Sequence, residues 1–162
     1  MMISIIGIVV VFLGGVLLVR ELSASRRSRL HLCEEFYRFL VHIRTQIGCF
    51  LRTPCEIAES FRGEELSKIG FLKLISQGEG FLVAFEVSKS EKYLSAEQSR
   101  ILSELFSSLG GGYLQDEIKL IDGYTVEFFA SLEKERKECS RDLKLISTLS
   151  CSGTLGIIIL LL

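Results

Sequence analysis

The chain has one uncharged and mainly apolar run at each end, and between the two runs its apolar residues recur at helical spacing. The first run, residues 1–19, contains no charged side chain. As a helix it reaches roughly 28 Å, close to the hydrocarbon thickness of a bilayer, about 30 Å. The last run, residues 145–162, is also uncharged and reaches about 27 Å. The pattern predicts a transmembrane helix at each terminus.

Each run also admits another interpretation. The small residues Ser23-Ala24-Ser25 resemble the cleavage site of a secretory signal, and an apolar run can also be a buried helix of a soluble protein. The length of the first run and the lack of Lys or Arg before it favour a membrane span. The last run begins with several Ser and Thr residues, so packing on the soluble domain or lying in the membrane interface are its alternatives.

Between the runs, apolar residues at three-and-four spacing predict amphipathic helices. The first extends from about Ser25 to Leu51 and continues the first span without a break. Its predicted inward face comprises Leu30, Cys33, Phe36, Tyr37, Leu40, Ile43, Ile47, Phe50 and Leu51. A later helix, Glu64 to Ser76, carries Leu66, Ile69, Leu72 and Ile75 on one side.

Local signals predict where other helices begin and end. In Thr53-Pro54-Cys55-Glu56, a threonine cap precedes proline at the first helical position and glutamate at the third. Ser95 and Gln98 repeat this capping-box pattern. Turns are predicted at Thr53 and Pro54, at Gly78 to Gly80, and at Gly110 and Gly111.

The remaining segments complete an all-helical reading. The short apolar run Phe81 to Val87 favours helix over an isolated strand, and a long helix starts near Tyr113 and continues into the last apolar run. We therefore expect an all-α fold in which a cytoplasmic helical bundle lies between N- and C-terminal transmembrane helices. The expected domains are residues 1–19, 20–144 and 145–162.

Charge placement predicts the topology. All 19 Lys and Arg and all 20 Asp and Glu residues lie between the two runs. Basic residues flank both predicted spans on that side, namely Arg20, Arg26, Arg27, Arg29, Arg141 and Lys144. Because basic loops stay on the cytoplasmic side, the bundle is expected in the cytoplasm and both termini outside. The net charge of −1 gives no general attraction to nucleic acid.

No residue pattern predicts an active site. The five cysteines show no CxxC spacing, and Cys33 and Cys139 fall at apolar helix positions where cysteine acts as a small hydrophobe. His31 and His42 would lie roughly 16 Å apart on one helix, too far to share a metal. Carboxylate pairs such as Glu34-Glu35 are expected to be solvated. We therefore expect a protein that is not an enzyme, with no catalytic, cofactor-binding or metal-binding residues.

The order of these features resembles the stage III sporulation protein AB family. The matching features are an N-terminal span with a basic flank, the Thr53-Pro54 turn, an aromatic at Phe85, the Leu109-Gly110 step, and a charged helix leading into the tail GTLGIIILLL. The resemblance covers essentially the whole chain. The sequence departs from the family where many members have tryptophan in place of Phe85 and a Ser-Asp step after the Leu-Gly.

The resemblance implies a function that the residue pattern alone does not. This family is a component of the sporulation channel, located in the mother-cell membrane around the forespore, and its helical domain is similar to the F-type platform proteins of type II secretion. It implies a non-enzymatic platform in an oligomeric assembly, whose partners are the lipid bilayer, a cytoplasmic secretion-type ATPase (the sporulation AA protein) and other channel subunits. The alternative is a membrane-anchored helical regulator or sensor that binds a soluble signalling partner.

Overall fold

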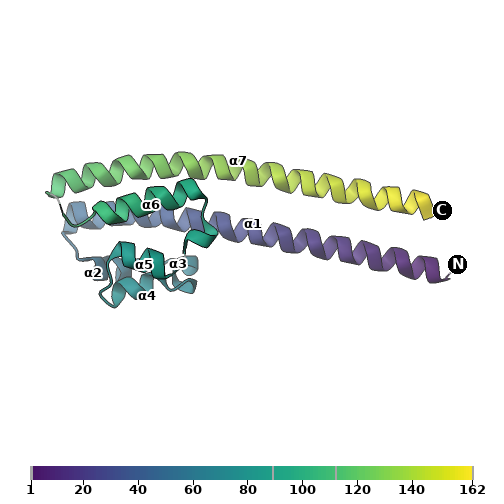
Figure 1. The fold of residues 1–162 in the computed structure, drawn as a ribbon, viewed down its shortest axis with the longest axis horizontal. Helices are drawn as coiled ribbons and strands as arrows, with labels where there is room; N and C mark the ends of the chain where they lie inside the picture. The colour runs from purple at the N-terminus through teal and green to yellow at the C-terminus, as the bar shows by residue number, and fades with distance from the viewer. Residues whose placement is uncertain (1, 89, 112, 162) are drawn as a thin grey trace. The chain divides into compact units, whose positions relative to one another are not determined.

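A computed structural model describes residues 2–88, 90–111 and 113–161, and these residues form helices and connecting turns without a strand (Figure 1). The predicted all-α fold is confirmed. The chain divides into two compact units. The terminal unit comprises Met1–Ser28 and Glu135–Leu162, and the central unit comprises Arg29–Lys134. Two long helices, α1 (Met2–Phe50) and α7 (Leu114–Leu161), contribute to both units.

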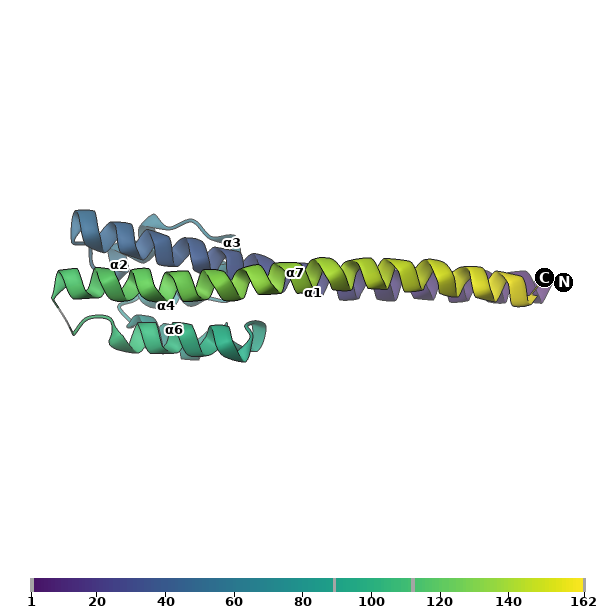
Figure 2. The same ribbon diagram turned by 90° about the horizontal axis from the view of Figure 1, so that it is seen from above.

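In the terminal unit, the first part of α1 and the last part of α7 run side by side in opposite directions (Figures 1 and 2). Arg26 on α1 lies 3.7 Å from the carboxylate of Asp142 on α7. Among the side chains that the structure describes, no helix is both long and apolar enough to cross a bilayer. The predicted spans, residues 1–19 and 145–162, consist almost entirely of residues whose side chains lie outside the described part.

In the central unit, α1 and α7 run alongside α6, and a group of short helices packs beside α1 (Figures 1 and 2). The remaining elements are α2 (Pro54–Ser60), α3 (Glu64–Lys68), α4 (Phe71–Ser76), α5 (Phe81–Val87), the 3-10 helix η1 (Ser90–Tyr93) and α6 (Ala96–Ser108). The predicted helix at Phe81–Val87 is confirmed as α5. The continuous helix predicted through residue 25 is also confirmed, since α1 has no break.

An aromatic cluster forms the core where the short helices meet α1 and α6. Its rings pack edge-to-face or stacked with centroids 5.4 to 6.1 Å apart, and they belong to Phe36, Phe39, Phe71, Phe81, Phe85 and Phe106. Full burial of one such side chain stabilises the folded state by about 1.5–3 kcal/mol, and the ring geometry adds to this. The central unit thus has a core of its own.

Both capping boxes predicted from the sequence are present. The side chain of Thr53 accepts a hydrogen bond from the backbone of Glu56, whose carboxylate in turn accepts one from the backbone of Thr53 at 2.8 Å. The carboxylate also accepts from the Thr53 hydroxyl at 3.0 Å, and these two bonds, first that from the backbone, hold the pKa of Glu56 below its usual value. Ser95 and Gln98 form the equivalent box at the start of α6. These local signals therefore place two helix starts correctly.

The prediction of one helix over residues 64–76 is wrong. The segment is divided into α3 and α4 by Gly70, which has a left-handed conformation with φ of +79°. The division turns Phe71, which was absent from the predicted inward face, into a fully buried core residue. The predicted inward face of α1 was likewise too narrow, because it omitted the fully buried Phe39.

The prediction that Glu34-Glu35 is a solvated pair is wrong for Glu35. Helix α3 begins after Gly63, which has no side chain to cap the free backbone N–H groups. The Glu35 carboxylate accepts hydrogen bonds from the backbone N–H groups of Glu64 and Leu66, both at 3.0 Å. A side chain of α1 therefore caps a helix that lies some thirty residues further along the chain.

The prediction that Cys33 and Cys139 act as small hydrophobes is confirmed, since both are buried. Cys33 also donates a hydrogen bond from its thiol to the side-chain oxygen of the buried Gln98, at 3.4 Å. That oxygen accepts a second bond from the backbone of Ser95. The thiol therefore connects α1 to the capping box of α6.

Candidate docking site at one end of the central unit

At the end of the central unit where α1 ends and α7 begins, a mainly apolar pocket of about 440 Å³ opens to the surface. We call it the tip pocket. Its walls come from both of these helix ends, from the starts of α2 and α5, and from the end of α6. The lining residues are Ile47, Leu51, Arg52, Pro54, Gly80, Phe81, Leu82, Val83, Phe106, Leu109, Gly110, Leu114 and Glu117.

Two of the predicted turns meet at this pocket. Pro54 follows the Thr53 cap and lines the pocket from the start of α2. Gly110 lines it after the end of α6 and has φ of +95°, a conformation that side chains disfavour. The backbone N–H of Gly110 donates to the carboxylate of Glu117 at 2.9 Å, which ties this turn to the first turn of α7. Gly111 is exposed beside it and does not line the pocket.

Large apolar side chains are exposed at Leu51, which lines the tip pocket, and at Phe50 and Tyr113, which are the chain neighbours of the lining residues Leu51 and Leu114. Phe50 is 60%, Leu51 72% and Tyr113 86% exposed. The prediction that Phe50 and Leu51 face the core is therefore wrong, because α1 ends at Phe50 and the periodicity no longer applies. Leu51 has φ of +51°, a strained conformation for a bulky residue that costs about 1–2 kcal/mol. Exposed apolar groups and local strain of this kind concentrate at functional sites.

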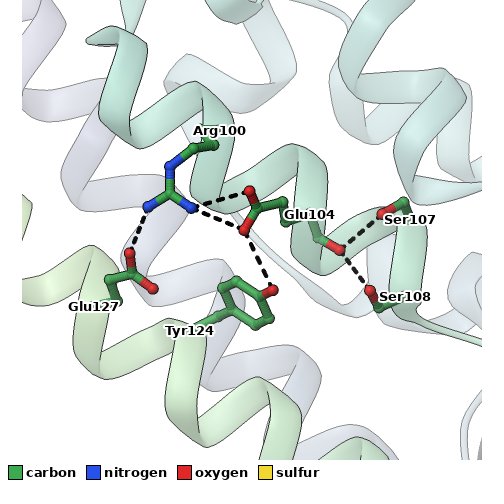
Figure 3. A network of polar contacts seen from close by, with 6 residues as sticks. All are labelled: Arg100, Glu104, Ser107, Ser108, Tyr124 and Glu127. Carbon is green, nitrogen blue, oxygen red and sulfur yellow. Dashed lines mark hydrogen bonds and ion pairs between the residues drawn. The ribbon is translucent and has the colours of Figure 1, made fainter.

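A polar network connects α6 to α7 (Figure 3). Arg100 contacts both oxygens of Glu104 at 3.0 and 2.9 Å and reaches Glu127 on α7 at 2.7 Å. Its hydrogen bonds, first that to Glu104, raise the pKa of Arg100. The Tyr124 hydroxyl donates to the Glu104 carboxylate at 3.4 Å. The pKa of Tyr124 is raised, mainly by burial and next by the negative charge of Glu104. The network fixes the register of α6, whose last turn supplies part of the pocket wall.

The chemistry of the tip pocket is that of a docking surface. Arg52 and Glu117 are the ionisable residues of its lining, and the rest is apolar apart from glycine and proline. Within the described parts of the chain, no group of three or more His, Cys, Asp or Glu residues could hold a metal ion. An apolar pocket with an exposed leucine, Leu51, in its lining can accept an anchoring side chain of a partner protein.

The basic residues predicted to flank the membrane are distributed over both units. Arg20, Arg26, Arg27, Arg141 and Lys144 are exposed and belong to the terminal unit. Arg29 belongs to the central unit, where its Nε donates to the backbone carbonyl of Tyr93 at 3.1 Å. Five of the six residues therefore belong to the terminal unit.

Comparison with known proteins identifies the family. The model of the stage III sporulation protein AB family matches residues 4–162. The chain belongs to this family. The resemblance inferred from the sequence is confirmed, and membership of the stage III sporulation protein AB family makes this a sporulation protein. No curated protein and no solved structure matched the chain.

Sequence reasoning identified the turns of the tip pocket but not the pocket. The sequence predicts separate turns at Thr53-Pro54 and at Gly110. Both turns reach the same pocket only because five helices pack together around it. One available signal was the apolar pair Phe50-Leu51, which only Arg52 separates from the helix-start motif at Thr53. Because the next helix starts at Pro54, the preceding helix has to end near Phe50, and these two side chains then no longer belong to its buried face.

Proposed function

We propose that this protein is a non-enzymatic inner-membrane platform subunit of a sporulation secretion channel, and that it couples a cytoplasmic secretion ATPase to the membrane complex. The observation that carries the proposal is the family match over residues 4–162. A separately packed helical unit with an exposed apolar pocket also supports a role in assembly.

In this proposal the membrane-spanning segments are residues 1–19 and 145–162, and residues 20–144 form the cytoplasmic domain. Support comes from the two uncharged runs and from the basic residues on their inner flanks. The side-by-side course of α1 and α7 in the terminal unit is consistent with two spans that enter the membrane together (Figures 1 and 2). The protein would reside in the mother-cell membrane around the forespore, with both termini outside.

We further propose that the tip pocket is where the ATPase binds. Leu51 and Tyr113 are exposed in the isolated chain, and a partner that covers them would remove apolar surface from water at about 25 cal/mol per Å². The pocket opens to solvent through exposed residues such as Leu51 and Leu114, which favours docking of a protein side chain over enclosure of a small ligand. This feature favours the platform over the alternative of a regulator that senses a small molecule.

The experiment is co-purification of the ATPase with the full-length protein in detergent. Leu51→Glu places a charge at the pocket mouth and is expected to reduce ATPase retention about tenfold or more, since a buried unpaired charge is costly. The matched control is Val87→Glu, because Val87 is 58% exposed on α5 but does not line the pocket.

The two parts of the proposal fail in different ways. If the wild-type protein does not retain the ATPase under conditions that keep both folded, the ATPase is not its partner. If retention is the same for Leu51→Glu and Val87→Glu, the ATPase binds elsewhere.

A further inference from the structure

A second surface of the central unit, separate from the tip pocket, forms an open groove of about 650 Å³ between α1 and the end of α2. We call it the cationic groove. Its lining residues, none of which lines the tip pocket, are Tyr37, Arg38, Val41, His42, Thr45, Ser60, Phe61 and Arg62.

The groove has a surplus of positive charge. Arg38 and Arg62 are exposed, and neither has a carboxylate within ion-pair distance among the residues that the structure describes. The hydroxyl groups of Thr45 and Ser60 already have partners. Thr45 donates to the carbonyl of Val41 at 3.0 Å, and Ser60 donates to that of Ile57 at 3.0 Å. The guanidinium groups are therefore the charged donors available to a ligand, and the Tyr37 hydroxyl is a neutral one.

His42 adds a hydrogen-bonding group but no charge at neutral pH. Its Nε2 lies 3.0 Å from the Ser60 oxygen, and because the Ser60 hydroxyl donates to Ile57, that oxygen is left to accept from His42. Burial is the main cause that lowers the pKa of His42, and the nearby Arg52 lowers it further. The charge of the groove therefore comes from its arginines.

The rest of the groove is apolar and held in place by packing. The ring of Phe61 packs against Phe39 at 5.1 Å and lies 5.9 Å below the Arg38 guanidinium. Gly63 is required for this position, since a Cβ atom there would come within 2.6 Å of the Phe61 ring. Val41, at the edge of the groove, is 42% exposed.

This combination suits a polypeptide better than a small anion. Ligand pockets bury most of a small molecule's surface, whereas this groove is open along its length. A free phosphate or acetate would pair with the arginines but leave Val41 and Phe61 in water. A peptide segment can present carboxylates to guanidinium groups and an apolar side chain to the floor at the same time.

We propose that the cationic groove binds an acidic amphipathic segment of another protein, with carboxylates on Arg38 and Arg62 and an apolar side chain over Val41 and Phe61. Guanidinium groups can hold carboxylates through two parallel hydrogen bonds, so each arginine can fix the orientation of the carboxylate it binds. The proposal is independent of the ATPase and of the tip pocket.

The test uses the full-length protein in detergent and two labelled synthetic peptides of equal length. One peptide alternates Glu with Leu and Phe, and the other has Gln in place of every Glu. Fluorescence anisotropy is expected to show the acidic peptide binding about tenfold more tightly, with an affinity that falls as salt is added. The double variant Arg38→Gln/Arg62→Gln is expected to lose this preference.

Two control variants distinguish a specific effect of the groove arginines on peptide binding from a general effect of charge. Lys73→Gln/Lys92→Gln removes the same charge from exposed positions outside the groove and is expected to keep the preference. Arg38→Lys/Arg62→Lys keeps the charge and is expected to restore only part of it, because lysine cannot form the two-bond contact.

Three results would overturn the proposal. The first is equal binding of both peptides by the wild-type protein. The second is a preference that survives Arg38→Gln/Arg62→Gln or disappears in Lys73→Gln/Lys92→Gln. The third is a protein that binds phosphatidylserine vesicles through Arg38 and Arg62 but does not bind the acidic peptide. This result would show that the groove binds a lipid surface.

Discussion

The side chain of Glu35 joins α1 to the start of α3, because its carboxylate accepts two backbone hydrogen bonds at 3.0 Å. Glu35→Ala leaves both N–H groups without this acceptor, so we expect the free energy of unfolding to fall by about 1–3 kcal/mol. Urea denaturation of the full-length protein would measure this. Glu86→Ala, at an exposed position on α5, is the control and should change stability by no more than about 0.5 kcal/mol. Equal stability of the two variants would contradict the capping role.

His42 should make stability depend on pH. Its pKa in the folded protein is lowered from 6.5, mainly by burial. Below pH 6.5 the unfolded chain therefore binds a proton that the folded chain does not, and the free energy of unfolding falls until pH reaches the lowered pKa. Above pH 6.5 this contribution is constant.

The pH effect can be assigned to one histidine by comparing midpoints of thermal unfolding between neutral and mildly acidic pH. His42→Gln is expected to flatten the acid side of the profile. His31→Gln, whose side chain is 67% exposed, serves as the comparison and should leave the slope in place. A slope that persists in His42→Gln would assign the acid sensitivity to another group.

At the scale of helices, the division between α3 and α4 depends on the backbone of Gly70. Its φ of +79° is unfavourable for any residue with a Cβ atom, although a Cβ there would meet nothing within 4 Å. Gly70→Ala is therefore expected to destabilise the central unit by about 1 kcal/mol through backbone strain alone. Gly80→Ala is the matched control, since Gly80 also has open space around it but an ordinary φ of −67°.

The two glycine variants separate conformation from packing. Urea denaturation of both should show a loss of stability in Gly70→Ala and little change in Gly80→Ala. If both lose the same amount, the cost lies in something other than the left-handed backbone at residue 70.

Helix starts were predictable from the sequence, but the internal division of a helix was not. The boxes at Thr53 and Ser95 each involve residues three apart in the sequence, so a local pattern contains the whole interaction. The break at Gly70 interrupts an apolar pattern that remains helical on both sides, and a lone glycine is tolerated in many helices. The long-range cap by Glu35 leaves no local pattern at all.

At the scale of the molecule, the all-α fold followed from periodicity, whereas the candidate sites did not. The tip pocket requires five helices to converge, and the cationic groove requires Arg62 to lie beside Arg38 on a different element. Such contacts depend on packing angles that sequence spacing does not specify. Phe39 was missed for a related reason, since α1 is covered by the short helices on one side and by α7 on another (Figure 2).

The proposed topology makes a prediction about the whole chain that native cysteines can test. Cys49 is exposed in the central unit, while Cys33 and Cys139 are buried. If residues 20–144 lie in the cytoplasm, a membrane-impermeant maleimide should label Cys49 only after protoplasts are lysed, and a Met2→Cys variant should be labelled in intact protoplasts. Cys49→Ser should remove most of the lysis-dependent signal and so assign it. Labelling of Cys49 in intact protoplasts would place the central unit outside, because a charged reagent does not cross the bilayer, and the basic flanks would then have failed to orient the chain.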